Sequence, residues 1–359
     1  MAAGHLSVRR EGGYAMNERD EKIIRAVVEK ARRVCPGSLA LVGVYGSART
    51  GDTHARSDLD LLILINDDNG WRLATGFILD DVQIGYDIYC TSWQMLEDDA
   101  ACPHAHLGKL MDSDIVYAAD QSAQSRLEKL RERAAALLRS DERFRRADDI
   151  TDRLCRAYAE AMSAASLGKA RAFAAYAVSL SLDAVMLKNG RYFRRGVKRT
   201  FEELDGLPLP QRYVETIGAI VRARDMAGLA AALTALVRAM LACTRREGEK
   251  QPSTPDALRG TYEEMFSNWR SKMPEAAARG DAFSSFMNMA SLQAMLDDIA
   301  GETDIPAFDV MASYDPDDLA GNARAFDDAL SAYRREYDRL GMTPRRYRDV
   351  DEFVKDYLG

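Results

Sequence analysis

Two aspartates, Asp58 and Asp60, stand at the start of an apolar run that ends at Ile65. Side chains two positions apart in a strand lie on the same face, so both carboxylates would point one way while Leu59 and Leu61 point the other. Two carboxylates this close repel each other unless a cation lies between them. Mg²⁺ is often held by one or two carboxylates together with substrate phosphates. The spacing therefore predicts a Mg²⁺ site at Asp58 and Asp60.

A third aspartate, Asp87, lies inside a strand-like stretch over residues 82–90. Aspartate is depleted in strands, so its presence there indicates a chemical role. If this strand neighbours the run that ends at Ile65, three carboxylates converge on one patch. Such a patch can hold two metal ions about 3.5–4 Å apart, which clamp the attacking and leaving oxygens of a phosphoryl displacement. We therefore predict Asp58, Asp60 and Asp87 as catalytic metal ligands, and Asp87 could instead take the proton from an acceptor hydroxyl.

Upstream of the aspartates, a second apolar run breaks at Gly46-Ser47. A Gly-Ser turn that leaves a buried strand exposes backbone N–H groups and a hydroxyl, which can cradle the terminal phosphates of a nucleotide. Arg49 in the same loop could add positive charge, and Gly51 flexibility. Gly46, Ser47 and Arg49 are accordingly predicted to bind nucleotide.

The order of these motifs resembles the DNA polymerase β-type nucleotidyltransferase superfamily, and within it the bacterial small-molecule and aminoglycoside-type nucleotidyltransferases. The residues that fall on the family pattern are Gly46, Ser47, Gly51, Ser57, Asp58 and Asp60, with Asp87 as the third carboxylate. The resemblance implies Mg²⁺-dependent transfer of a nucleoside monophosphate, AMP from ATP in first place, to a hydroxyl group. It also adds Ser57 to the expected nucleotide-binding residues.

The elements that must position these residues are predicted from hydrophobic periodicity and turn residues: a helix over 17–34, strands over 39–45, 59–65, 82–90 and 115–118, and later helices over 122–139, 151–189, 257–272, 282–299 and 322–340. We expect an α/β (α+β) nucleotidyltransferase domain with a short mixed sheet at 17–120. A disordered lead-in at 1–16 would precede it. A larger all-helical domain at 121–359 would follow, with a division near 244–256 as an alternative.

The helical half carries a basic segment over residues 188–199. If it is helical after Gly190, its positively charged residues form one face suited to a triphosphate: Arg191, Arg194, Arg195 and Lys198. A similar stretch in bacterial nucleotidyltransferases favours Lys198 as a phosphate contact. A solvated basic surface is the alternative.

Asp183 falls at the centre of the apolar stripe of its helix, where a carboxylate is costly unless it is paired or faces a cleft. It could bind an acceptor amine or act as a base. Pairing with a buried arginine, such as Arg153 or Arg156, is the favoured alternative. Glu160 lies off the apolar stripe of its own helix and is the weaker acceptor-binding candidate.

His104 and His106 have a spacing that could ligate a metal, but no cysteine or further histidine is placed to complete a site. A role in a loop or at the surface is expected for both. The acidic cluster that ends at Asp99 is expected to be a helix end in solvent.

Composition excludes several classes of function. The net charge of −7 among 359 residues argues against a large nucleic-acid-binding surface. The five cysteines show no paired spacing, which argues against a disulfide framework or a zinc site and favours the cytoplasm. The chain has no uninterrupted run of about eighteen apolar residues, so no membrane span is expected. The expected partners are a nucleotide and a small-molecule acceptor, and the oligomeric state is open.

The sequence therefore predicts a cytoplasmic nucleotidyltransferase that uses Mg²⁺, in two copies if Asp87 takes part, with an aminoglycoside-like antibiotic as the leading acceptor. One alternative is a protein-adenylylating enzyme of the toxin–antitoxin type, against which the long helical half argues. A second alternative is a nucleotide-binding regulator without catalysis. The presence of all three carboxylates argues against that one.

Overall fold

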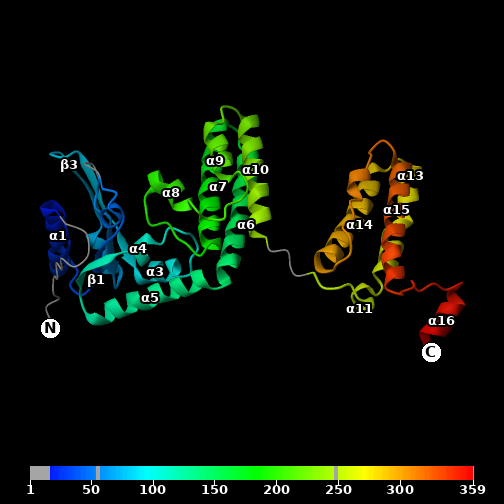
Figure 1. The fold of residues 1–359 in the computed structure, drawn as a ribbon, viewed down its shortest axis with the longest axis horizontal. Coiled ribbons are helices and arrows are strands. Elements are labelled where there is room, and N and C mark those ends of the chain that lie inside the picture. Colours follow the sequence, from blue (N-terminus) through cyan, green and yellow to red (C-terminus); the bar gives the residue numbers. More distant parts are fainter. Residues whose placement is uncertain (1–16, 54–56, 246–249, 359) are drawn as a thin grey trace. The chain divides into compact units, whose positions relative to one another are not determined.

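The computed structural model describes residues 17–53, 57–245 and 250–358. Residues 1–16, for which the sequence predicts a disordered lead-in, lie outside the described residues. The chain forms two compact units, Met1–Arg245 and Arg246–Gly359 (Figure 1). The division falls inside the polar segment 244–256. Each unit is described by itself.

The first unit is built on a four-stranded mixed sheet. Its strands are β1 (Leu39–Val44), β2 (Leu61–Ile65), β5 (Cys90–Ser92) and β6 (Asp114–Ala118), in the order β5-β2-β1-β6. β1 is antiparallel to both β2 and β6, and β2 is parallel to β5. Every residue of β1 and β2 is buried, as in a sheet that is covered on both faces. The predicted short mixed sheet is confirmed.

Helices cover the two faces of this sheet. α1 (Glu18–Val34) is amphipathic and places Ile24, Val27 and Val28 in one core with alternate residues of the strands. Asn17 caps it by accepting a hydrogen bond from the backbone N–H of Asp20 at 2.9 Å. α3 (Trp93–Asp99) and α5 (Gln121–Arg139) contribute to the core on the opposite face. Because helices pack on both faces of the sheet, the ends of β1 and β2 are held in fixed positions.

A separate hairpin carries Asp87. β3 (Thr75–Leu79) and β4 (Ile84–Ile88) form a two-stranded antiparallel sheet, preceded by the 3-10 helix η1 (Asp68–Leu73). The single strand predicted over 82–90 is therefore wrong. Its first part pairs with β3, and only β5 joins β2. The physical reason lies in the burial pattern, because β4 alternates between buried and exposed residues while β5 enters the covered sheet.

The rest of the first unit is helical. Its elements are α2 (Ser47–Thr50), α4 (Gly108–Met111), α6 (Glu142–Met162), α7 (Leu167–Lys188), η2 (Val197–Arg199), α8 (Thr200–Leu204), α9 (Tyr213–Arg222) and α10 (Met226–Thr244). α6, α7, α9 and α10 pack together as a bundle (Figure 1). α7 and α10 are long and apolar enough to cross a membrane, but this is a weak indication because core helices meet the same criteria.

The second unit is a small helical body with its own core. It contains α11 (Pro255–Leu258), α12 (Thr261–Met265), η3 (Phe266–Arg270), α13 (Lys272–Arg279), α14 (Ala282–Glu302), η4 (Met311–Ser313), α15 (Leu319–Arg339) and α16 (Val350–Leu358). The predicted helix over 257–272 is thus broken into short pieces. Phe326, Tyr333 and Tyr337 of α15 are fully buried at its centre. The overall prediction of a short mixed sheet followed by a larger helical region is confirmed.

Candidate active site

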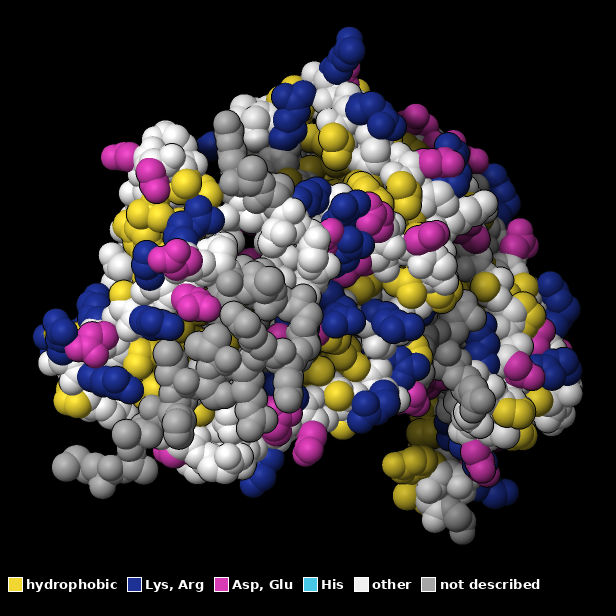
Figure 2. Space-filling model, turned by 60° about the vertical axis from the view of Figure 1, so that its left-hand side comes forward, with side chains coloured by type: hydrophobic (Ala, Val, Ile, Leu, Met, Phe, Trp, Pro, Cys, Tyr) yellow, Lys and Arg dark blue, Asp and Glu magenta, His cyan; other side chains and the backbone are white. Residues whose placement is uncertain are grey.

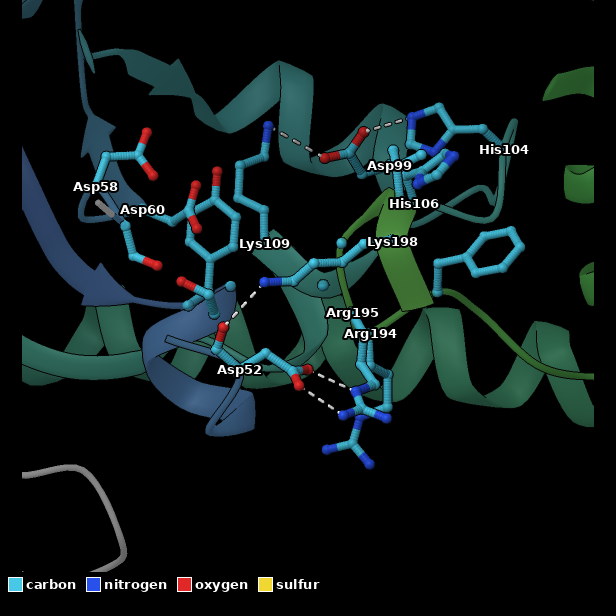
Figure 3. Close-up of a pocket in the computed structure, with 18 residues that line it drawn as sticks. Asp52, Asp58, Asp60, Asp99, His104, His106, Lys109, Arg194, Arg195 and Lys198 are labelled. Atoms are coloured by element: carbon cyan, nitrogen blue, oxygen red, sulfur yellow. Dashed lines mark hydrogen bonds and ion pairs between the residues drawn. The ribbon is translucent and has the colours of Figure 1, made fainter. Parts of the chain in front are cut away.

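A cavity of about 690 Å³, the main cavity, opens beside the end of β1 (Figure 3). Three segments supply its lining. The strand ends and their loop give Tyr45, Gly46, Ser47, Asp52, Ser57, Asp58 and Asp60; the α3–α4 region gives Asp99, His104, His106, Gly108 and Lys109; the segment after α7 gives Phe193, Arg194, Arg195, Gly196, Val197 and Lys198. The sheet and the helical part of the first unit therefore share one cavity.

Asp58 and Asp60 reach the main cavity because their leucine neighbours are buried. Leu59 and Leu61 are buried in the core. The two aspartates occupy the alternate positions and face the cavity (Figure 3). The backbone N–H of Tyr45 donates to the carbonyl of Asp60 at 3.1 Å, which continues the β1–β2 ladder past the strand ends. The predicted alternation is confirmed. Burial raises the pKa of the Asp60 carboxyl above its usual value, and the nearby charge of Asp58 adds to the rise.

Gly46 is required by this arrangement for two reasons. Its φ of +68° is a conformation that other residues rarely adopt. A Cβ at this position would also overlap the carboxylate of Asp60. With no side chain in the way, the chain turns into α2, and the backbone N–H of Ser47 hydrogen bonds to that carboxylate and opposes the rise of its pKa. The Gly-Ser turn and the aspartate are therefore parts of one structure.

Asp87 is exposed and does not line the main cavity. It lines a second cavity, of about 610 Å³, with the stacked rings of Phe77 and Tyr86 and with Asp58. Asp58 thus belongs to both cavities. Among the described residues, no group of three or more His, Cys, Asp or Glu side chains is arranged to hold a metal ion. The three-carboxylate site stays a prediction.

A carboxylate from the sheet side holds the basic segment in place. Asp52 accepts two hydrogen bonds from Arg195, both at 2.6 Å, and lies 3.3 Å from Arg199. Its backbone carbonyl accepts from Nζ of Lys198 at 3.3 Å. Hydrogen bonds from Arg195 are the main reason that the pKa of Asp52 falls to about 2. This link, drawn in Figure 3, joins the loop after β1 to the segment after α7.

The opposite wall carries two histidine–carboxylate pairs. Nε2 of His104 lies 3.4 Å from Asp99, which also lies 3.5 Å from Lys109. Nε2 of His106 lies 3.6 Å from Oδ1 of Asp183. In Figure 3 both imidazoles lie across the cavity from Asp58 and Asp60. The main cavity therefore has carboxylates at one end, imidazoles at the other, and cations along its side.

Comparison with known proteins now bears on this geometry. Residues 21–93 match a family model described as "Nucleotidyltransferase domain". The first unit contains a nucleotidyltransferase domain. The matched range includes the Gly-Ser turn and all three predicted carboxylates, and it ends before the histidines and the basic segment. It supports nucleotidyl transfer in general and says nothing of the acceptor.

Among solved structures, the chain is similar to a nucleotidyltransferase-like protein from Exiguobacterium sibiricum 255-15. The two are 13% identical, the match covers 78% of this chain and 91% of that chain, and the TM-score is 0.36. At that TM-score the likeness carries no argument. No curated protein matches the sequence.

The residues predicted to bind nucleotide differ in their positions relative to the main cavity, and their contact with nucleotide stays a prediction. Ser47 and Ser57 line the main cavity, as does Lys198 from the helical part. Arg49 is different, because its guanidinium pairs with Asp114 at 2.8 Å and it does not line the cavity. Its predicted contact with nucleotide stays a prediction.

The helix predicted after Gly190 is wrong. Residues 191–196 have no helical structure, and the basic segment contains only the short 3-10 helix η2 at its end. Gly190 has a φ of +65° and the backbone N–H of Arg191 returns to the carbonyl of Met186, so the chain turns away as α7 ends. Arg194, Arg195 and Lys198 still reach the main cavity, and Arg191 is exposed outside it.

The two acceptor-binding candidates have different surroundings. Asp183 is buried, but its partners are the backbone N–H of Ala105, at 2.9 Å, and His106. The favoured pairing with Arg153 or Arg156 is therefore wrong: Arg153 donates instead to the carbonyl of Pro103 and to Tyr176. Glu160 is exposed on α6 and lies outside the lining of the main cavity.

Sequence reasoning missed Tyr45, Asp52, Asp99 and Lys109 as cavity residues. Asp99 was expected at a helix end in solvent, yet its side chain is only 15% exposed because Lys109 and His104 cover it. Asp99 lies at the end of α3, close to the two histidines in the sequence, and this proximity could have indicated that it lines the same cavity. Burial of Tyr45 beside Asp60 and Asp58 raises its pKa to about 12, so its phenol stays protonated near neutral pH.

Proposed function

We propose that this protein is a Mg²⁺-dependent nucleotidyltransferase that moves a nucleoside monophosphate, AMP from ATP in first place, to a hydroxyl of a small molecule in the cytoplasm. The observation that carries the proposal is the main cavity itself. It brings the Gly46-Ser47 turn, Asp58 and Asp60 together with cations from a segment far along the chain. The nucleotidyltransferase domain that spans most of these residues supports the reaction class.

The carboxylates fit a hard divalent cation. Asp58 and Asp60 offer oxygen ligands from one side of the strand, and their mutual repulsion and burial raise the pKa of Asp60. Bound there, Mg²⁺ would neutralise charge on the triphosphate and on the departing pyrophosphate. A second ion would need Asp87, which lines the second cavity together with Asp58.

The remaining cavity residues position the nucleotide. The Ser47 hydroxyl would bind a terminal phosphate oxygen, and Ser57 lies on the same wall. Lys198, which Asp52 holds through its carbonyl, would place an ammonium group against the triphosphate. Catalysis by these groups consists of positioning and charge neutralisation, as in other phosphoryl transfers.

The acceptor proposed first is an aminoglycoside-like polycation. The net charge of −7 supports attraction of a cationic small molecule. On the face in Figure 2, Lys and Arg side chains are interspersed with Asp and Glu, which favours a small acceptor over an extended polyanion. Asp183 is buried behind His106, so we expect it to act through that histidine.

The test is Mg²⁺-dependent pyrophosphate release from ATP across aminoglycosides, other small hydroxyl compounds and a macromolecular cell fraction. Asp60→Asn should lower turnover by at least about 100-fold because it removes a metal ligand. Asp205→Asn, at an exposed site outside the cavity, is the matched control. Release with the macromolecular fraction alone would contradict a small-molecule acceptor and favour protein adenylylation. Full turnover in Asp60→Asn would contradict the metal assignment.

A further inference from the structure

One wall of the main cavity presents two histidines that have no part in binding phosphates. His104 and His106 lie on the loop between α3 and α4. The residue between them is held from both sides. The backbone N–H of Ala105 donates to Oδ1 of Asp183 at 2.9 Å, and its carbonyl accepts from the N–H of Phe193 at 2.8 Å. The loop thus joins α7 to the segment after it, and both imidazoles are presented to the cavity on a fixed backbone.

His106 has the surroundings of a general base. Its Nε2 faces Oδ1 of Asp183 at 3.6 Å, and the side chain of that aspartate is 8% exposed. Its ring stacks on buried Phe193, with centroids 5.1 Å apart, while 59% of the His106 side chain stays exposed. A nearby carboxylate favours a proton on the ring nitrogen that faces it, and the other nitrogen is then free to accept one. Nδ1 is therefore the nitrogen offered to a bound substrate.

Other basic groups of the main cavity are less suited to this task. Asp99 shares its oxygens between His104 and Lys109. Nε2 of His104 faces Asp99, and its Nδ1 is buried. Asp87, a sequence-based candidate for the same proton, is exposed and lines the second cavity instead. His106 combines an exposed ring with a buried orienting carboxylate.

We propose that His106, oriented by Asp183, is the general base that takes the proton from the acceptor hydroxyl, and that the acceptor binds at the end of the main cavity beside Phe193. This role rests on the nucleotidyl transfer proposed above. The hydroxyl oxygen forms a bond to the α-phosphorus of ATP as the bond from that phosphorus to its bridging oxygen breaks. Pyrophosphate leaves with the electron pair of the broken bond. The hydroxyl proton passes to Nδ1 of His106 and then to solvent, while Asp183 is a positioning residue.

Charged and titratable groups from three elements surround the pair formed by His106 and Asp183. Asp183 of α7 faces it, and His104 of the same loop lies 6.4 Å away between ring centroids. Arg153 of α6 acts on Asp183. Burial raises the pKa of the Asp183 carboxyl, and the Ala105 N–H, both histidines and Arg153 oppose the rise. Protonation of His106 removes the lone pair on Nδ1, so kcat should fall toward low pH.

The test measures pyrophosphate release by the full chain from Mg²⁺–ATP, with an acceptor found in the screen or with water as the acceptor. His106→Gln keeps a polar side chain but removes the base. We expect kcat to fall about 100- to 10,000-fold and the acid limb of its pH profile to disappear. Free imidazole should restore turnover to His106→Ala.

Asp183→Asn tests the positioning role. It should lower kcat, because the imidazole of His106 loses the carboxylate that orients it. KM for ATP should stay within about twofold, since the nucleotide is bound elsewhere. Asp205→Asn, at an exposed site outside the main cavity, is the matched control and should keep both kcat and the acid limb.

The possible failures are distinguishable. Retention of kcat and of the acid limb in His106→Gln overturns the general-base role while wild-type pyrophosphate release still supports nucleotidyl transfer. An unchanged kcat in folded Asp183→Asn overturns it as well, and far-UV circular dichroism verifies the fold of each variant. A wild-type protein that releases no pyrophosphate with any acceptor or with water contradicts the proposed function and the role of His106 with it.

Discussion

At the scale of single residues, the position of one carboxylate depends on the absence of a side chain next to it. Asp60 occupies the space that a Cβ of Gly46 would fill. The buried side chains of Leu59 and Leu61 anchor the strand in the core, and the lack of a side chain at Gly46 leaves space for the carboxylate of Asp60. The Gly-Ser turn, which is predicted to bind phosphates, therefore also determines the position of the predicted metal ligand.

Gly46→Ala tests this coupling, with Gly51→Ala as a matched control. Both glycines have positive φ, +68° and +74°. Gly51 is in the left-handed α conformation, so Gly51→Ala should lower the free energy of unfolding by about 1–2 kcal/mol. Gly46→Ala should lower it by more, because its Cβ also overlaps the carboxylate of Asp60. Only the Gly46 variant displaces Asp60, because a Cβ at Gly51 has nothing within 4 Å. We expect pyrophosphate release to be lost in Gly46→Ala and kept in Gly51→Ala. Equal turnover in the two variants would contradict the coupling.

At the scale of elements, the segment after α7 depends on a partner from the sheet side. Asp52 binds Arg195 through two hydrogen bonds, and the pair is separated by 143 positions in the sequence. Basic residues alone indicate a phosphate site, but the guanidinium of Arg195 is hydrogen bonded to Asp52. Lys198, whose contact is a single 3.3 Å hydrogen bond to the carbonyl of Asp52, is freer to bind phosphate.

Lys198→Ala should therefore weaken Mg²⁺–ATP binding. Loss of one charge-assisted hydrogen bond is worth about 1.5–3 kcal/mol, which corresponds to a rise in Kd of about tenfold or more. Arg191→Ala, an exposed cation outside the main cavity, should leave Kd unchanged. Isothermal titration calorimetry measures both. An unchanged Kd in Lys198→Ala would show that this residue is only part of the surface.

The link between Asp52 and Arg195 also predicts a pH dependence of stability. The pKa of Asp52 is lowered to about 2 in the folded protein, so its stabilising contribution is complete above the ordinary value of 3.8. It should be lost as pH falls from about 4 toward 2. The Tm of Asp52→Asn should fall less steeply than that of the wild type over this interval. Asp205→Asn, exposed and away from the link, should keep the wild-type slope, and parallel slopes for all three proteins would contradict the prediction.

Sequence periodicity predicted the structural features that are determined by residues close together in the sequence. The alternation of Leu59 and Leu61 with two aspartates is local, and the direction of the carboxylates follows from it. The pairings of Asp52 with Arg195 and of Asp183 with His106 join residues that lie far apart in the sequence and belong to different elements. A local sequence pattern cannot predict which of these side chains, distant in the sequence, come into contact. For the same reason, the prediction of a single strand over 82–90 was wrong: its two parts pair with strands of different sheets, and such pairing is not local.

At the scale of the whole molecule, every described residue that lines the two cavities named above lies before residue 200. The first unit, Met1–Arg245, also contains the two cores that hold the sheet and the helical bundle. The second unit has a separate core around Phe326 and Tyr333. The binding and chemistry proposed here should therefore reside in the first unit.

Truncation after Arg245 tests that division. Because units with separate cores can fold alone, residues 1–245 should unfold cooperatively and keep kcat within about threefold of the full chain. Residues 246–359 should give a helical circular dichroism spectrum and no pyrophosphate release. The control is truncation after Leu187, which removes Lys198 together with α9 and α10 and should abolish both folding and turnover. If the first unit folds alone but loses turnover, the second unit supplies a group that the reaction needs, and adding residues 246–359 as a separate chain would show whether that group acts in trans.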